Sequence, residues 1–170
     1  CWTYAELGAL VDRAARGLQD QGLKPGDRFG LCLGNSPYNV VLFYAVLRIG
    51  GVVVNLNPLY TAMELDHLLR DSGMRMVAVP EVRFVHEKVE GVARAAGVEK
   101  IVLCRMAQIL PFALNLGYRL LRRSDHVRIT DPALNLELTD LLANAGNPDA
   151  VSRQPDDVAV LQYTGGTTGL

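Results

Sequence analysis

The residues best suited to chemistry lie in a glycine- and threonine-rich run at residues 163–170, which reads Tyr-Thr-Gly-Gly-Thr-Thr-Gly-Leu. It directly follows an apolar stretch, residues 158–161, that predicts a strand. Because glycines expose backbone N–H groups and threonine hydroxyls add donors, a turn of this kind can bind the phosphates of a nucleotide. A flexible turn or linker is the alternative on these residues alone. The candidate phosphate-binding residues are Thr164, Gly165, Gly166, Thr167, Thr168 and Gly169.

This run differs from two familiar nucleotide-binding signatures. The Walker pattern G-x-x-x-x-G-K-[ST] has a lysine after its glycines, and no lysine follows these glycines up to Leu170. The segment Gly30–Gly34 lacks the G-x-G-x-x-G spacing of dinucleotide-binding proteins. The sequence therefore does not favour a dehydrogenase.

The preceding chain alternates strand and helix patterns. Two helix starts have the spacing of a capping box, Thr3 with Glu6 and Thr61 with Glu64, and a third has Ser36 as its cap before a proline. We expect helices after these caps and over residues 84–96, a shorter helical stretch over 134–145, and apolar strands over residues 29–33, 52–56, 76–79, 100–104 and 158–161.

Short apolar strands separated by helices predict an α/β fold with a mostly parallel sheet and helices on both faces. The helix after Ser36 is apolar nearly all round, with Arg48 its one charged residue, so we expect it to be sandwiched and not to lie on the surface. Open parallel sheets bind ligands beyond the carboxyl ends of their strands. The run after residues 158–161 would lie at that edge.

Composition narrows the class of protein. The 170 residues, 49% hydrophobic and 21% charged, suit a globular domain with a real core. Seventeen basic and 18 acidic residues give a net charge of -1, which does not indicate a nucleic-acid surface, so any anion site must be local. The chain begins with Cys and has no charged and apolar leader pattern, so we expect a sequence truncated at both ends.

Neither cysteines nor histidines form a metal-binding pattern. Cys1, Cys32 and Cys104 are odd in number and far apart, which argues against disulfides and zinc, and we expect the last two to be core residues. His67, His86 and His126 lack metal-ligand spacing and are interpreted as solvated or structural. Ser36 is better explained as a helix cap than as a nucleophile, and the adjacent pair Asp156 and Asp157 as exposed loop carboxylates than as cation ligands.

Residues 105–123 interrupt the alternation with a largely apolar helical segment that ends in positive charge at Arg119, Arg122 and Arg123. Its roughly 15 apolar residues are too few to span a bilayer, which needs about 20, but such a helix can lie in the membrane interface with its arginines toward lipid phosphates. The alternative is an inserted helix that packs on the domain. We favour packing, because an apolar helix is more often core than anchor.

Taken with its strand, the run at residues 163–169 resembles the phosphate-loop signature of the adenylate-forming (AMP-binding) superfamily, which includes acyl-CoA synthetases, peptide-synthetase adenylation domains and luciferases. Residues 2–7, 22–28 and 35–37 look like the usual N-terminal segments of that family, so the resemblance covers essentially the whole chain. Residues 57–61 followed by Glu64, together with the apolar insert, are most similar to the branch that acts on medium and long fatty acids. Residues 1–170 would then be the N-terminal portion of the adenylation domain, without the C-terminal subdomain.

The resemblance implies a long-chain fatty-acid CoA ligase that uses ATP, Mg²⁺ and coenzyme A. It implies that the lysine after the loop, a later Tyr-Gly-x-Thr-Glu motif, the hinge and the C-terminal domain lie beyond Leu170, so we expect residues 1–170 alone to be inactive. It also implies a cytoplasmic protein that contacts the inner face of a membrane peripherally. Two other readings stay open: an adenylating enzyme for an aryl, short-chain or amino acid, and a non-catalytic membrane-association module.

Overall fold

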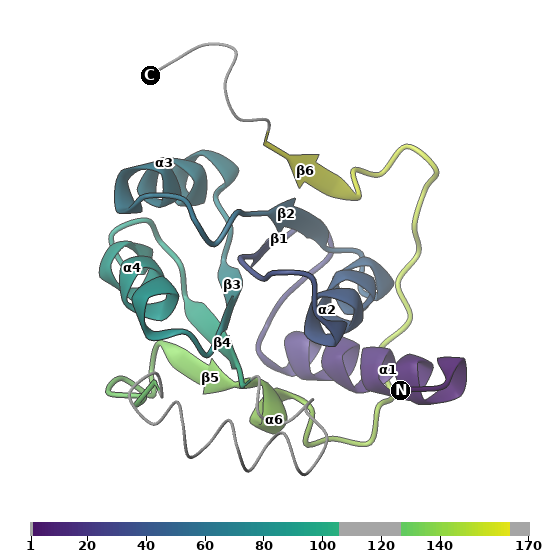
Figure 1. Ribbon diagram of the computed structural model, residues 1–170. Coiled ribbons are helices and arrows are strands. Elements are labelled where there is room, and N and C mark those ends of the chain that lie inside the picture. Colours follow the sequence, from purple (N-terminus) through teal and green to yellow (C-terminus); the bar gives the residue numbers. More distant parts are fainter. Residues whose placement is uncertain (1, 106–126, 164–170) are drawn as a thin grey trace.

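The computed structural model describes residues 2–105 and 127–163; residues 1, 106–126 and 164–170 lie outside the described part (Figure 1). The strands are β1 (Arg28–Leu31), β2 (Val52–Asn55), β3 (Met76–Pro80), β4 (Lys100–Cys104), β5 (Asn135–Glu137) and β6 (Val160–Gln162). The helices are α1 (Tyr4–Asp20), α2 (Pro37–Arg48), α3 (Ala62–Ser72), α4 (Arg83–Ala93) and α6 (Leu138–Leu141).

The six strands form one sheet in the order β5-β4-β3-β1-β2-β6, and every neighbouring pair is parallel. In Figure 1, α3 and α4 lie on one side of this sheet and α1, α2 and α6 on the other. This confirms the predicted α/β class with a parallel sheet covered on both faces. All carboxyl ends of the strands consequently meet at one edge.

Alternate strand residues point to opposite faces, as the period of a β-strand requires. Val53 packs into the core cluster beneath α1 and α2, whereas Val54 packs into the cluster beneath α3 and α4. In β6, Val160 contacts the first cluster and Leu161 the second. The continuous apolar strands in the sequence thus reflect burial on both faces.

The predicted helix caps are confirmed. At α1 the Thr3 side chain accepts from the backbone N–H of Glu6, and the Glu6 carboxylate accepts from the backbone N–H of Thr3 at 2.7 Å. Thr61 and Glu64 make the same reciprocal pair at α3. Ser36 caps α2, with its side chain accepting from a backbone N–H in the first turn.

The prediction for residues 134–145 is wrong in its first part, where the chain forms β5 before the short helix α6. Leu134, Leu138 and Leu141 are all buried, and their spacing imitates one face of a helix. Pairing with β4 in parallel register overrides this pattern, because it adds ladder hydrogen bonds that a helix over these residues would not make.

The prediction that α2 is sandwiched holds for only one side of the helix. Val41, Leu42 and Val46 are buried, but Val40 is 41% exposed and Tyr44 is 55% exposed. The helix packs on the sheet and on α1, whereas Val40 and Tyr44 on its other side remain partly exposed. The predicted helical insert lies outside the described residues beyond Arg105.

Candidate functional site

β6 occupies one end of the sheet and delivers the chain to the carboxyl edge. It pairs with β2, with Val160 opposite Val53 and Gln162 opposite Asn55. Tyr163 follows as the last described residue, so the glycine- and threonine-rich run starts at the edge where open parallel sheets bind ligands. The candidate residues Thr164 to Gly169 themselves lie outside the described part, and their role stays a prediction.

Neutral amide side chains surround this corner of the sheet. The Asn55 amide Nδ2 donates to the Gln162 carbonyl Oε1 at 2.8 Å, which links the last residues of β2 and β6. An open cavity of about 350 Å³ lies beside them and is also lined by Asn35, Asn39 and Phe43. All described residues that line this cavity are uncharged.

Tyr163 lies on the face of the sheet opposite to Gln162 and is held there by packing and by a hydrogen bond. Its ring packs against the core cluster beneath α3 and α4, and its hydroxyl donates to the carboxylate of Asp71 on α3 at 2.5 Å. Burial, together with the hydrogen bond to Asp71, raises the pKa of Tyr163 to about 12. The hydroxyl therefore remains a protonated donor at neutral pH.

The other half of the carboxyl edge is ionic. Arg105, which follows β4, donates from Nε to Glu137 at 2.6 Å and from Nη1 to Glu81 at 2.5 Å, and its Nη2 forms a second contact with Glu137. The Glu81 side chain is 1% exposed, and the Tyr38 hydroxyl donates to the Arg105 backbone carbonyl at 3.1 Å. These carboxylates raise the pKa of Arg105, which holds the chain where the apolar insert begins.

The loop between β2 and α3, residues 57–61, also lies at the carboxyl edge. The Lys88 ammonium of α4 donates to the carbonyls of Tyr60 at 2.6 Å and Pro58 at 3.2 Å, and it lies 5.3 Å from the centre of the Phe84 ring. Asn57 accepts from the backbone N–H of Leu59 at 2.9 Å. This segment thus acts locally as a turn and a helix cap, held by a lysine that sequence reasoning did not identify.

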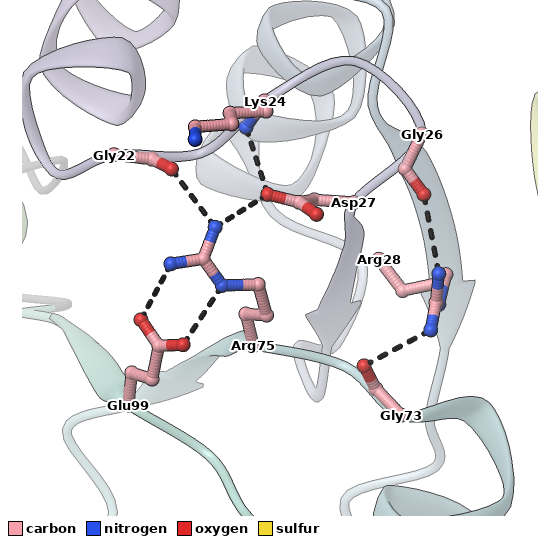
Figure 2. A network of polar contacts seen from close by, with 8 residues as sticks. All are labelled: Gly22, Lys24, Gly26, Asp27, Arg28, Gly73, Arg75 and Glu99. Atoms are coloured by element: carbon pink, nitrogen blue, oxygen red, sulfur yellow. Dashed lines mark hydrogen bonds and ion pairs between the residues drawn. The ribbon is translucent and has the colours of Figure 1, made fainter.

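A second ionic cluster lies at the amino edge of the sheet (Figure 2). Arg75 lies just before β3, and its guanidinium contacts Glu99 through two hydrogen bonds of 2.8 and 2.7 Å. Its Nη1 donates to Asp27 at 2.6 Å and to the Gly22 carbonyl at 2.9 Å. These contacts raise the pKa of Arg75 and lower that of Glu99. One side chain therefore joins the entrances to β1, β3 and β4.

Arg28, at the start of β1, completes the amino edge. Its Nε donates to the carbonyl of Ser72 at 2.8 Å, and its Nη2 to that of Gly73 at 3.4 Å. Carbonyls at a helix C-terminus lack partners within the helix and carry partial negative charge, so an arginine there stabilises α3. Gly73 has a φ of 58°, the left-handed conformation that ends many helices.

The titratable residues outside these clusters have structural explanations. His86 is 2% exposed and bonds through Nε2 to the Asn135 amide oxygen at 2.7 Å, whereas His67 is exposed, as expected for both. His126 lies outside the described residues. Burial raises the pKa of Cys32 to about 12 and also raises that of Cys104, so both thiols stay protonated in the core.

The described residues contain neither a cluster of metal ligands nor a membrane-spanning helix. Within residues 2–105 and 127–163, no group of three or more His, Cys, Asp or Glu side chains is placed to hold a metal ion. In the same ranges no helix is both long and apolar enough to cross a membrane. Asp157 accepts from the backbone N–H of Gln154 at 2.8 Å and so closes its own turn. The residues Arg119, Arg122 and Arg123 lie outside the described part.

Sequence reasoning missed the side chains that hold the chain in front of the glycine-rich run. Asn55 and Gln162 each end an apolar strand, and polar residues at the carboxyl ends of parallel strands are the signal that points to them. Asp71 gives no such signal, because it is one of several polar residues on an exposed helix face.

Comparisons with known proteins agree with this geometry. The chain is 35% identical to a long-chain-fatty-acid–CoA ligase of Bacillus subtilis, over 98% of this chain and 30% of that protein. Its structure is similar to that of a long-chain-fatty-acid-CoA ligase from Archaeoglobus fulgidus, with a TM-score of 0.73 and 25% identity, over 98% of this chain and 28% of the other. It is also similar to ATP-bound MatB from Rhodopseudomonas palustris, with a TM-score of 0.70 and 29% identity, over 98% and 27% of the two chains.

The chain thus spans less than a third of the length of these relatives. The model of the AMP-binding enzyme family matches residues 1–170, which is the whole sequence. The chain belongs to the AMP-binding enzyme family.

Proposed function

We propose that the protein to which this chain belongs activates a long-chain fatty acid with ATP and transfers the acyl group to coenzyme A. The observation that carries the proposal is the 35% identity to the Bacillus subtilis long-chain-fatty-acid–CoA ligase over 98% of this chain. The position of the glycine- and threonine-rich run after β6, at the carboxyl edge of a parallel sheet, supports it.

The proposed reaction has two steps. A carboxylate oxygen of the fatty acid attacks the α-phosphorus of ATP, the bond from that phosphorus to the bridging oxygen breaks, and pyrophosphate leaves. The thiol sulfur of coenzyme A then attacks the acyl carbon and loses its proton, the bond from that carbon to AMP breaks, and AMP leaves. The products are a thioester, AMP and pyrophosphate.

The run at residues 164–169 would serve the first step. An anionic carboxylate must approach a phosphorus surrounded by anionic oxygens, so donors positioned on the β- and γ-phosphates stabilise the departing pyrophosphate. Thr164, Thr167 and Thr168 would supply hydroxyls, and Gly165, Gly166 and Gly169 would let the backbone approach. The uncharged cavity beside Asn55 and Gln162 suits this role, because it places no carboxylate against the phosphates.

Magnesium enters this proposal with the nucleotide. Mg²⁺ is commonly held by substrate phosphates together with one or two carboxylates. The described residues contain no cluster of ligands that would hold a metal ion by itself. We therefore assign the ion to ATP and attribute no step to a protein metal site.

The test is carboxylate-dependent exchange of pyrophosphate into ATP by the protein from the complete reading frame, with acids from acetate to oleate and with aryl and amino acids. Exchange that is greatest with long fatty acids, followed by thioester formation with coenzyme A, supports the proposal. Exchange with only a short, aryl or amino acid keeps the adenylation step but overturns the fatty-acid assignment. No exchange with any acid overturns both.

A threonine variant with a matched control connects this activity to the run. Thr167→Val removes one proposed phosphate donor and should lower exchange by about 10-fold or more, the usual cost of losing a hydrogen bond to a charged group. Thr130→Val changes an exposed threonine elsewhere in the chain and should leave exchange unchanged. Residues 1–170 expressed alone should show no adenylation.

Peripheral contact with a membrane through the apolar segment that ends at Arg119, Arg122 and Arg123 is a second candidate, set against the favoured packing of that segment on the domain, and it rests on the sequence. Flotation with anionic liposomes tests it. Salt-sensitive binding that is lost when the three arginines are replaced by glutamine supports the contact, whereas unchanged partitioning removes the electrostatic argument.

A further inference from the structure

The two residues in front of the candidate phosphate-binding run are held from opposite faces of the sheet. Gln162 shares a face with Val160, toward α2, and Tyr163 shares a face with Leu161, toward α3. Each makes a side-chain hydrogen bond to a different element, β2 in one case and α3 in the other. The chain therefore reaches Thr164 from a point fixed on both sides.

The bond on the α2 face joins two adjacent strand ends. Asn55 and Gln162 are register partners, and their 2.8 Å amide contact continues the pairing of β2 and β6 beyond the backbone. Gln162 is exposed, so this contact competes with water and has a modest effect.

The hydrogen bond on the α3 face, from Tyr163 to Asp71, involves a charged acceptor and is therefore the stronger type. A hydroxyl that donates to a carboxylate at 2.5 Å is a charge-assisted hydrogen bond, which is about twice as strong as a neutral one. The partly buried Tyr163 ring adds packing against the core cluster beneath α3 and α4. A phenylalanine would keep that packing and remove only the hydroxyl, so the two contributions can be separated.

A turn that binds phosphates through backbone N–H groups works best when its donors are already in place. The position of its first residue depends on the residue before it, which is Tyr163. We propose that Tyr163 with Asp71, and to a smaller degree Gln162 with Asn55, are positioning residues that hold the start of the phosphate-binding run for ATP. The proposal rests on the proposed function and adds residues that act through the run.

The experiment measures exchange kinetics of the full-length protein with ATP and the preferred carboxylate varied separately. Tyr163→Phe and Asp71→Ala should each raise the KM for ATP by about 10-fold, the loss of one hydrogen bond to a charged group. The KM for the carboxylate should stay within about twofold, because the proposed role of the run is to bind phosphate and not the acyl group. Asp71→Asn retains an acceptor oxygen and should restore most of the affinity for ATP.

The matched control is Asp66→Ala, which removes another α3 carboxylate, one that pairs with Arg70 at 3.0 Å and is not a partner of Tyr163. It should leave both KM values unchanged. The double variant Tyr163→Phe/Asp71→Ala should be no worse than either single variant, since both remove the same bond. Asn55→Leu should raise the KM for ATP by about threefold, as expected for an exposed neutral bond.

The failures of the two proposals are distinguishable. A wild-type protein without exchange overturns the proposed function. An active wild type with an unchanged KM for ATP in Tyr163→Phe and Asp71→Ala overturns the positioning role. So does an equal rise in both KM values together with a lower melting temperature, which is the pattern of general destabilisation. If Tyr163→Phe does not fold, the exposed Asp71 variants still decide between these outcomes.

Discussion

The amino edge of the sheet and the corner formed by β2 and β6 at the carboxyl edge use different chemistry. At the amino edge the polar side chains are charged, and their donors are taken up within the domain, as Figure 2 shows for Arg75 and Arg28. At the β2–β6 corner the cavity is lined by amides and apolar groups, and it is open to solvent. The guanidinium of Arg75 is occupied by its own contacts, whereas the β2–β6 corner leaves amide groups accessible.

The difference fits the proposed phosphate binding at the β2–β6 corner. Ion pairs at strand entrances fix β1, β3 and β4 relative to one another and need no ligand. A corner that receives an anionic phosphate chain gains from neutral neighbours, because a carboxylate there would oppose the ligand. We therefore expect substitutions at the amino edge to change stability, and those at the β2–β6 corner to change affinity for ATP.

The largest expected effect concerns the ion pairs of Arg105, which lie at the carboxyl edge but away from the neutral β2–β6 corner. Arg105→Met leaves the almost fully buried Glu81 without its arginine, and breaking a buried ion pair in this way costs about 3–5 kcal/mol of unfolding free energy. Urea unfolding of the full-length protein measures the shift in midpoint. This substitution sharpens the comparison, because it asks whether charge near the site serves stability.

Two variants control for Arg105. Arg70→Met removes a surface pair with Asp66 on α3 and should cost no more than about 0.5 kcal/mol. Adding Glu81→Gln to Arg105→Met removes the buried charge that has lost its arginine and should recover part of the loss. If Arg105→Met and Arg70→Met had equal, small effects, Glu81 would not depend on Arg105.

A smaller effect is expected at the amino edge. Arg75→Met removes hydrogen bonds to Glu99, Asp27 and Gly22, and because the partners are partly exposed we expect a loss of about 1–2 kcal/mol in unfolding free energy. The KM for ATP should be unchanged. Thermal unfolding and pyrophosphate exchange on the same protein check both points.

The matched control is Arg48→Met, which removes an exposed ion pair between Arg48 on α2 and Asp12 on α1. It should change neither the unfolding free energy nor the KM for ATP appreciably. A raised KM for ATP in Arg75→Met, with Arg48→Met unaffected, would break the comparison between the two edges.

Most of the scaffold follows from the sequence, because its signals are local. Thr3 and Thr61 each stand three residues before a glutamate, and the reciprocal bonds that this spacing predicts are present. The apolar strands separated by helices gave the parallel sheet, since such strands must be covered on both faces. The helix prediction for the first part of residues 134–145 was wrong because β5 pairs with β4, a long-range interaction that local periodicity does not report.

The candidate site was predictable only in part. The glycine- and threonine-rich run has a composition that indicates phosphate binding; β6 and Tyr163 bring the chain to the carboxyl edge, and Thr164 to Gly169 themselves lie outside the described residues. The partners Asn55 and Asp71 are 107 and 92 residues away from Gln162 and Tyr163 in sequence, so no local pattern links them. No local pattern links Arg75 to its partners Asp27 and Glu99 either, because only the order of the strands in the sheet brings them together.

The smallest expected effect concerns pH at the amino edge. Arg75 holds the pKa of Glu99 below its ordinary value of 4.5, so the stabilisation from this pair is present above about pH 4.5 and is lost as the pH falls through the lowered folded-state pKa. Glu99 is half exposed, and solvent screening keeps the contribution below about 1 kcal/mol. The difference in melting temperature between wild type and Glu99→Gln should therefore be measurable near neutral pH and should shrink in acid, as the pH falls below 4.5 and through the lowered folded-state pKa of Glu99. High salt at neutral pH should reduce it in the same direction. A difference that is equal at neutral and acid pH would mean that Glu99 contributes through packing, and the ionic description of the amino edge would then rest on Asp27 alone.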